Sequence, residues 1–92
     1  MSHRKIYKYT LGPESEVELP MQAEILCVHE QGEDICLWAL VNPQNEVEKR
    51  TFLSFGTGHK VSDLPLRYVG TSFLEGGLLV FHTFELLKEA QA

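Results

Sequence analysis

The sequence predicts an all-β domain: a small curled sheet or barrel made mainly of antiparallel hairpins. Three observations lead to this prediction. Several short segments alternate apolar and polar residues, which is the period of a strand with one face toward a core. Glycine, proline and asparagine turn signals separate these segments. Helix-forming composition is confined to the C-terminal FELLKEAQA, so we expect at most a short C-terminal helix.

The N-terminal half contains four of the predicted strands. KIYKYTL (5–11) and SEVELP (15–20) both alternate apolar and polar residues, and Gly12-Pro13 separates them. AEILCVHE (23–30) and DICLWALV (34–41) are apolar runs joined through Gln31-Gly32-Glu33. We predict a β-hairpin there, with Gly32 supplying the positive φ of the turn.

NPQN (42–45) is a second turn signal, and the strand EVEKRTFLSF (46–55) follows it. If these two strands pair across the turn, Val41 faces Val47, and Trp38 shares the opposite face with Arg50 and Phe52. Both faces of such a sheet are apolar, so it must curl into a barrel or meet another subunit. We therefore predict an oligomer interface at Trp38, Arg50 and Phe52.

The C-terminal half begins with the glycine loop GTGHK (56–60) and an irregular crossover interrupted by Pro65. RYVGTSFL (67–74) and LLVFHTFEL (78–86) then flank Glu75-Gly76-Gly77, which predicts a third hairpin.

Length, charge and composition limit the range of functions. The chain has 92 residues, 43% of them hydrophobic, and we treat 1–92 as one domain. Its net charge is −5, with 13 acidic residues against 8 scattered basic ones, which argues against a nucleic-acid partner. No run of about 20 apolar residues and no signal-peptide pattern occurs. We expect a cytoplasmic protein with reduced cysteines.

The GTGHK loop has two interpretations. Backbone N–H groups in a glycine loop can surround an anion, and Thr57, His59 and Lys60 add further donors. Alternatively, Gly56 and Gly58 serve only a tight turn that requires two positive φ values. The spacing is not that of a phosphate-binding P-loop, which needs a Lys-Ser/Thr pair and a following helix.

A phosphorylated ligand at this loop would need Lys60 and Arg67 to compensate its charge locally, because the protein is acidic overall. Tyr68 or Trp38 would stack on its base. The predicted ligand-binding residues are Gly56, Thr57, Gly58, His59, Lys60, Arg67 and Tyr68.

Catalysis and metal binding find little support. Cys27 and Cys36 are not spaced as zinc ligands, and small free cysteines commonly fill cores. His82 is expected to be partly buried and hydrogen-bonded to a neighbour. No nucleophile and base form a recognisable pair with an orienting carboxylate. We predict no catalytic residue, no metal site and no cofactor.

The ordered motifs KIYKY, ELPMQAEILCV, CLWALV, FGTGH, YVGT and LVFHTFE resemble a family of small proteins of unassigned function encoded by bacteriophages and prophages. The resemblance runs from Lys5 to about Glu85 and assigns no site residues. It implies a protein made in the cytoplasm of an infected or lysogenic bacterium, where small accessory proteins often block host machinery.

These observations lead to two functional hypotheses. The first is a non-enzymatic, homo-oligomeric binding protein that blocks host defence by sequestering a nucleotide-like ligand or masking a host protein. The second is a structural or regulatory protein–protein interaction module without a small ligand, in which the Trp38 face binds the partner.

Overall fold

The structure, a computed structural model, describes residues 2–88. Its regular elements form one seven-stranded sheet and a single turn of 3-10 helix, η1. In chain order they are β1 (Lys5–Leu11), β2 (Glu14–Pro20), β3 (Glu24–Gln31), β4 (Asp34–Val41), β5 (Val47–Gly56), β6 (Leu66–Leu74), η1 (Glu75–Gly77) and β7 (Leu79–Leu86).

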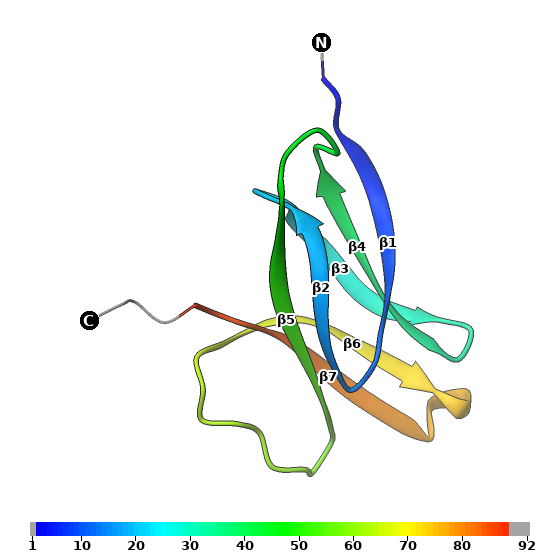
Figure 1. Cartoon of the computed structure of the whole chain (residues 1–92). Helices are drawn as coiled ribbons and strands as arrows, with labels where there is room; N and C mark the ends of the chain where they lie inside the picture. The colour runs from blue at the N-terminus through cyan, green and yellow to red at the C-terminus, as the bar shows by residue number, and fades with distance from the viewer. Residues whose placement is uncertain (1, 89–92) are drawn as a thin grey trace.

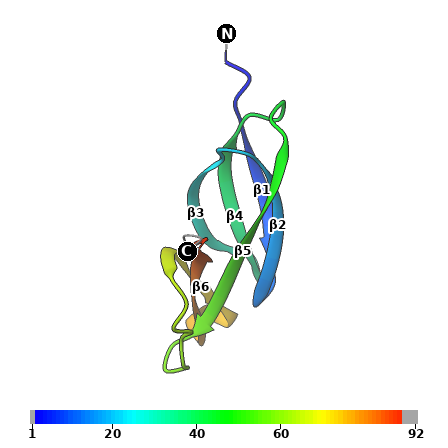
Figure 2. The same ribbon diagram turned by 60° about the vertical axis from the view of Figure 1, so that its left-hand side comes forward.

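The strands are arranged in the order β1-β4-β3-β6-β7-β5-β2 (Figure 1). Every neighbouring pair is antiparallel except β3 and β6, which run parallel. The sheet curls until its end strands, β1 and β2, approach each other, so it is nearly closed into a barrel. The molecule is flattened, with principal extents of 44 × 39 × 15 Å, and Figure 2 shows the narrower profile. The all-β prediction is confirmed.

Two predicted hairpins are present. The antiparallel β3–β4 ladder extends as far as the pair Gln31 and Asp34. Gly32, in the turn between them, has φ +63°. The β6–β7 ladder likewise extends as far as the pair Leu74 and Leu79, which flank η1. In both turns the chain reverses at glycines with positive φ, which is the conformation that the turn residues predict.

The predicted pairing across the NPQN turn is wrong. β4 lies between β1 and β3, and β5 lies between β7 and β2, so neither has a free edge for the other. Val41 is opposite Lys5, and Val47 is opposite Pro20. The turn therefore carries the chain across the barrel instead of closing a hairpin.

This topology separates the three predicted interface residues. Trp38 lies on the outer surface, between Lys8 of β1 and Cys27 of β3. Phe52 is a core residue with only 1% of its surface exposed, and Arg50 also points inward from β5. The prediction that Arg50 and Phe52 share a face with Trp38 is therefore wrong, because it depended on the β4–β5 pairing.

The C-terminal segment also differs from its helical composition. Residues 84–86 belong to β7, where pairing with β5 and β6 overrides helix propensity. Residues 89–92, the remainder of the expected short helix, lie outside the described residues. Between residues 2 and 88, no helix is long and apolar enough to cross a membrane.

The barrel interior is filled by alternate residues of several strands. Its buried hydrophobic members are Leu11, Val17, Leu19, Ala23, Val28, Ile35, Leu37, Ala39, Val41 and Phe52. The parallel β3–β6 junction is short and joins Val28 to Gly70. A Cβ atom at Gly70 would lie 2.1 Å from the Val28 carbonyl oxygen, so only glycine allows this approach.

Candidate functional site

A buried carboxylate organises one end of the barrel. Glu85 lies on the inward face of β7, opposite Phe52 of β5 on one side and Arg67 of β6 on the other. Only 5% of its surface is exposed. An isolated buried charge is strongly unfavourable, so Glu85 needs cationic partners.

Two arginines from different strands supply those partners. Arg50 donates from Nε to Glu85 Oε2 at 2.5 Å and from Nη2 to Oε1 at 2.8 Å, which is a bidentate pair. Arg67 donates from Nη2 to Oε1 at 2.8 Å. Arg50 also donates from Nη1 to the Ala23 carbonyl at 2.7 Å, which fixes its guanidinium against the start of β3.

The network shifts the pKa of both buried members. Burial by itself raises the pKa of Glu85, but the hydrogen bonds from Arg50 and Arg67 outweigh it and hold the pKa below its ordinary value. The hydrogen bonds to Glu85 likewise raise the pKa of Arg50, against the opposing effect of burial. The carboxylate therefore remains ionised at neutral pH and holds both guanidinium groups in place.

Arg50 and Arg67 line an open hollow of about 480 Å³. β-Bulges in β3 and β6 border this hollow, at Leu26 and Val69. The Arg67 side chain is 57% exposed and Arg50 is 13% exposed. Because Arg67 donates one nitrogen to Glu85, its other N–H groups remain for solvent or a ligand.

Two more side chains at this hollow affect what it can bind. Tyr68 is 56% exposed and lines the hollow as well, but its ring lies on the outer face of β6 against Phe84, whereas Arg67 faces inward toward Glu85. Glu24, an exposed residue at the start of β3, also lines the hollow and opposes an anion. The arginines can bind a small anion, with Glu24 limiting the affinity.

A hydrogen-bonded chain connects Tyr68 to the glycine loop across the outer face of β6 and β7. Tyr68 Oη lies 2.5 Å from Thr71 Oγ1, which lies 3.2 Å from His82 Nδ1. His82 Nε2 lies 2.8 Å from Thr57 Oγ1. His82 is therefore a partly buried, hydrogen-bonded histidine, as its sequence context predicted.

Aromatic rings continue the same outer face. Phe84 packs edge-to-face against Tyr68, with ring centroids 5.7 Å apart, and against Phe55 at 6.0 Å. These contacts pack the Tyr68 ring onto the outer face of β6 and β7.

The glycine loop itself has the geometry of a turn. Thr57 N–H donates to the Val80 carbonyl and His59 N–H donates to the Gly56 carbonyl, so two of its N–H groups are already used. Gly58 has φ +88°, whereas Gly56 does not have a positive φ, so the expectation of two positive φ values is wrong. Gly56 instead leaves room for the His59 ring, which a Cβ would approach to 2.9 Å.

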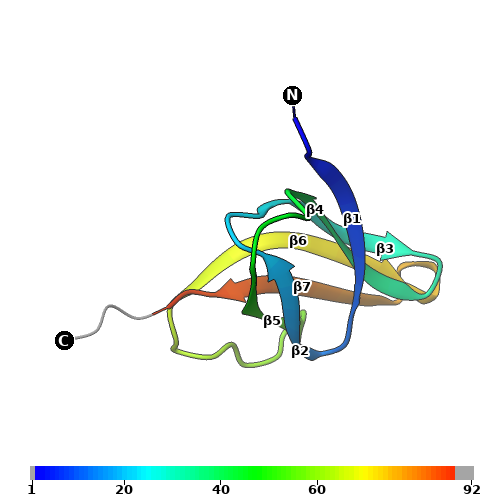
Figure 3. The ribbon, with the colours of Figure 1, turned by 45° about the horizontal axis from the view of Figure 1, so that its top comes forward.

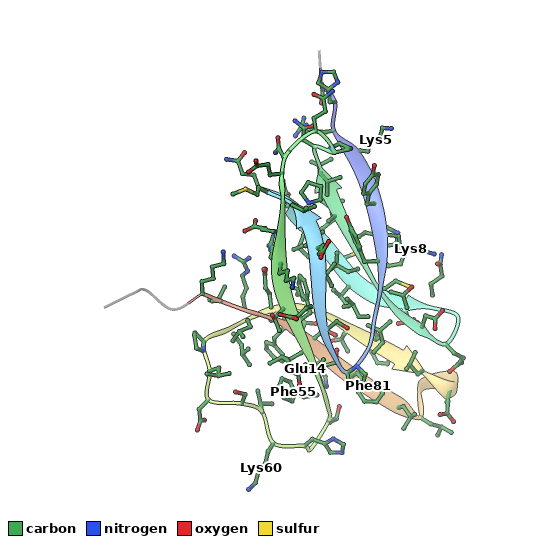
Figure 4. The ribbon with its side chains drawn as sticks, viewed as in Figure 1. Lys5, Lys8, Glu14, Phe55, Lys60 and Phe81 are labelled. Carbon is green, nitrogen blue, oxygen red and sulfur yellow. The ribbon has the colours of Figure 1, made fainter. Side chains whose placement is uncertain are left out.

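Lys60 extends from the loop away from the strands (Figure 4). The structure therefore divides the predicted ligand residues into two groups. Arg67 and Tyr68 lie at the hollow, and Thr57 is linked to Tyr68 through His82 and Thr71. In the described part of the chain, Lys60 forms no hydrogen bond or ion pair with either group, and it points outward.

Comparison with known proteins identifies the family. A family model for a domain of unknown function, DUF7352, matches residues 2–92. This chain belongs to the DUF7352 family. No curated protein and no solved structure matches it.

Other reactive side chains of the DUF7352 chain are dispersed. Within residues 2–88, no three histidine, cysteine or acidic side chains gather as a metal site. Cys27 is exposed and lies opposite Trp38, while Cys36 is buried and lies opposite His29. The two cysteines therefore occupy different environments on the β3–β4 hairpin.

The central residue of the DUF7352 hollow, Glu85, escaped the sequence-based prediction. A signal was nevertheless present, because strand alternation places Glu85 on the same inward side as Phe81 and Thr83. An acidic residue at an inward position implies a buried cationic partner. The sequence does not reveal which arginines meet it, since Arg50, Arg67 and Glu85 come together only through the pairing of β7 with β5 and β6.

Proposed function

We propose that this protein is a non-enzymatic binding protein that sequesters a small anionic, nucleotide-like ligand in the arginine hollow. One observation carries the proposal: Arg50 and Arg67 are held by one buried carboxylate and line the same open hollow as Tyr68. The hollow, at about 480 Å³, falls in the size range of small-molecule sites.

The binding mode follows from the positions of these groups. A phosphate accepts hydrogen bonds from the free N–H groups of Arg67, while Glu85 keeps the guanidinium oriented before the ligand arrives. A base that extends from the hollow to the outer face of β6 stacks on the exposed Tyr68 ring. Binding of this kind requires no nucleophile, general base or metal.

The resemblance to phage and prophage proteins supplies the biological part of the proposal. In an infected bacterium, a protein that traps a signalling nucleotide blocks the host defence that depends on that signal. A small protein without catalytic residues suits this role, because sequestration requires only that the protein bind the nucleotide tightly and be abundant.

Arg67→Ala should weaken ligand binding by about 1.5–3 kcal/mol, the usual loss for a hydrogen bond to a charged group. The measurement is isothermal titration calorimetry with ADP and a cyclic dinucleotide as probes, and with adenosine as the probe that lacks phosphate. Glu24→Gln should strengthen binding of the same probes, because it removes a negative charge from the rim.

Lys60→Ala is the matched control, because it also removes one positive charge. Wild-type affinity in this variant, together with weakened binding in Arg67→Ala, supports the hollow. The opposite result places the anion at the glycine loop, where loss of Lys60 is expected to cost about 1–3 kcal/mol. If neither phosphorylated probe binds the wild-type protein, the proposal fails for both ligand types.

The second candidate function is masking of a host protein, or a protein–protein module, through the Trp38 face. Its support is the outer surface of β1, β4 and β3, where Trp38 is half-buried. Ile6 and Leu26, which are 60% and 44% exposed, lie on the neighbouring strands. Half-buried tryptophans with exposed apolar neighbours are frequent anchors of protein interfaces.

Trp38→Asp should abolish partner binding while the domain remains folded, since Trp38 is only half-buried. The measurement is a pull-down from infected-cell extract, with circular dichroism to verify folding and Val61→Asp, at an exposed apolar residue of the β5–β6 loop, as control. Undiminished capture by Trp38→Asp would exclude this face as the binding surface.

A further inference from the structure

The sheet has two unpaired edges that border the same opening. β1 pairs only with β4 and β2 pairs only with β5, and no ladder joins β1 to β2. Figure 3 shows the two strands diverging from their shared turn. We call this opening the seam; its sides are Lys5–Leu11 and Glu14–Pro20. Each side presents unpaired backbone N–H and C=O groups, which are a template for another strand.

The turn between β1 and β2 prevents the chain from closing its own seam. Gly12 N–H donates to Ser15 Oγ at 2.8 Å, and Ser54 N–H donates to the Pro13 carbonyl at 2.9 Å. The first bond shapes the turn and the second ties it to β5. Beyond the turn, each strand follows its own neighbour in the sheet, so the two edges separate.

The outward-facing side chains of the two edges carry opposite charge. On β2 the outward positions before the terminal Pro20 are acidic and exposed: Glu14, Glu16 and Glu18. On β1 the central outward residue is Lys8, which is exposed and donates to Gln31 Oε1 at 2.5 Å. Figure 4 shows Lys8 midway along β1 and Glu14 at the start of β2.

The central inward-facing side chains at the seam are apolar or aromatic. Tyr7 on β1 is 38% exposed although it points to the core side of the sheet. Val17 and Leu19 on β2 are buried on that side. An added strand with the same alternation would therefore continue both the charged outer face and the apolar inner face.

We propose that a second copy of this chain closes the seam, forming a two-fold dimer in which β1 of each copy pairs with β2 of the other. Both edges border one opening, so a single two-fold rotation about an axis parallel to the strands satisfies both at once. Because β1 and β2 are antiparallel within a chain, the new pairs are antiparallel as well. Tyr7 of both copies then lies in the shared interior.

Charge selects this pairing over the alternatives. Pairing β2 with β2 would place glutamates against glutamates, and pairing β1 with β1 would bring Lys8 toward Lys8, both of which are unfavourable. In β1–β2 pairing, every register that keeps inward residues inward places Lys8 opposite an outward position of β2. Apart from the terminal Pro20, those positions are Glu14, Glu16 and Glu18, so the attraction tolerates a two-residue shift.

The test is sedimentation equilibrium of the full chain across protein concentration at low and high salt. Wild-type protein should reach twice the 10.5 kDa of one chain and should dissociate more readily at high salt. Lys8→Glu should raise the dimer dissociation constant roughly tenfold or more, since each of the two symmetric pairs becomes repulsive. Adding Glu16→Lys and Glu18→Lys to Lys8→Glu should restore dimerisation.

Two controls separate the seam from general effects. Lys60→Glu changes net charge by the same amount in the β5–β6 loop and should leave dimerisation unchanged. Gln31→Ala removes the contact of Lys8 with Gln31 and should also leave it unchanged. A wild-type protein that stays monomeric at high micromolar concentration overturns the proposal, and so does a Lys8→Glu variant that dimerises like Lys60→Glu.

This inference is independent of ligand binding, because the arginine hollow and the seam are built from different residues. The Arg67→Ala variant should therefore dimerise normally, and Lys8→Glu should bind ADP as the wild type does.

Discussion

Replacing Gly70 by alanine should destabilise the domain by more than about 3 kcal/mol, among the largest effects that a single methyl group can produce. The added Cβ would lie 2.1 Å from the Val28 carbonyl oxygen and 2.8 Å from its carbonyl carbon. Both atoms are backbone, so no side-chain rotation relieves the clash. β3 and β6 would have to separate at the one junction that joins the two parts of the sheet.

Urea denaturation followed by circular dichroism measures this effect. Gly12→Ala is the matched control, because its Cβ would meet only Ser15 Oγ at 3.7 Å, an ordinary contact, and Gly12 has no positive φ. We expect the control to remain within about 1 kcal/mol of the wild type. A Gly70→Ala protein as stable as the control would show that β3 and β6 do not approach as closely as described.

Glu85→Gln should cost about 3–5 kcal/mol at neutral pH. The amide keeps the size of the carboxylate but leaves the largely buried Arg50 guanidinium without a countercharge. It also replaces one acceptor oxygen by an NH2 group that faces donors. The loss extends to function, because Arg67 is no longer held at the hollow and should bind phosphate less well.

The same carboxylate makes stability depend on pH. The folded-state pKa of Glu85 lies below its unfolded value, so the folded state favours the ionised form. Its stabilisation is fully present above the unfolded pKa of about 4.3 and is lost as pH falls through the lower folded-state pKa. The stability difference between wild type and Glu85→Gln should therefore shrink upon acidification below about pH 4.

Glu48→Gln is the control for this prediction. Glu48 pairs with Lys88 at 3.5 Å, and the lysine is 81% exposed, so the pair should contribute about 0–1 kcal/mol. Equal losses in Glu85→Gln and Glu48→Gln, or a Glu85→Gln difference that does not shrink upon acidification, would contradict the role assigned to the buried network.

Local signals were sufficient for two of the hairpins. Gly32, and Gly76 with Gly77, have positive φ in the structure, and the flanking runs are long enough to pair directly. Turn chemistry and strand alternation act over a few residues, so they can be read without knowing the rest of the fold.

The same reasoning failed at the NPQN turn, for a physical reason. A polar turn between two strands is compatible with a hairpin and with a crossing to another part of the sheet. The outcome depends on competition for edges: β1 and β3 occupy both sides of β4, and β7 and β2 occupy both sides of β5. Consequently Arg50 was assigned to the Trp38 face, although it points into the barrel toward Glu85.

At the candidate site, too, some residues were predicted correctly and their partner was not. Arg67 was predicted as a ligand residue for its charge and Tyr68 for its aromatic ring, and both residues line the hollow. Their expected companion, Lys60, points away (Figure 4). The cation that does accompany them, Arg50, comes from β5, 17 positions before Arg67 in the printed sequence.

The amino-acid order alone therefore determined the fold class, most of the strands and the turns that glycine shapes, because these depend on local backbone preference and side-chain alternation. Strand neighbours, the Arg50–Glu85–Arg67 network and the unpaired seam were decided by tertiary structure. They depend on which distant edges bury the most apolar surface and satisfy the most backbone groups together, and this is a property of the whole chain.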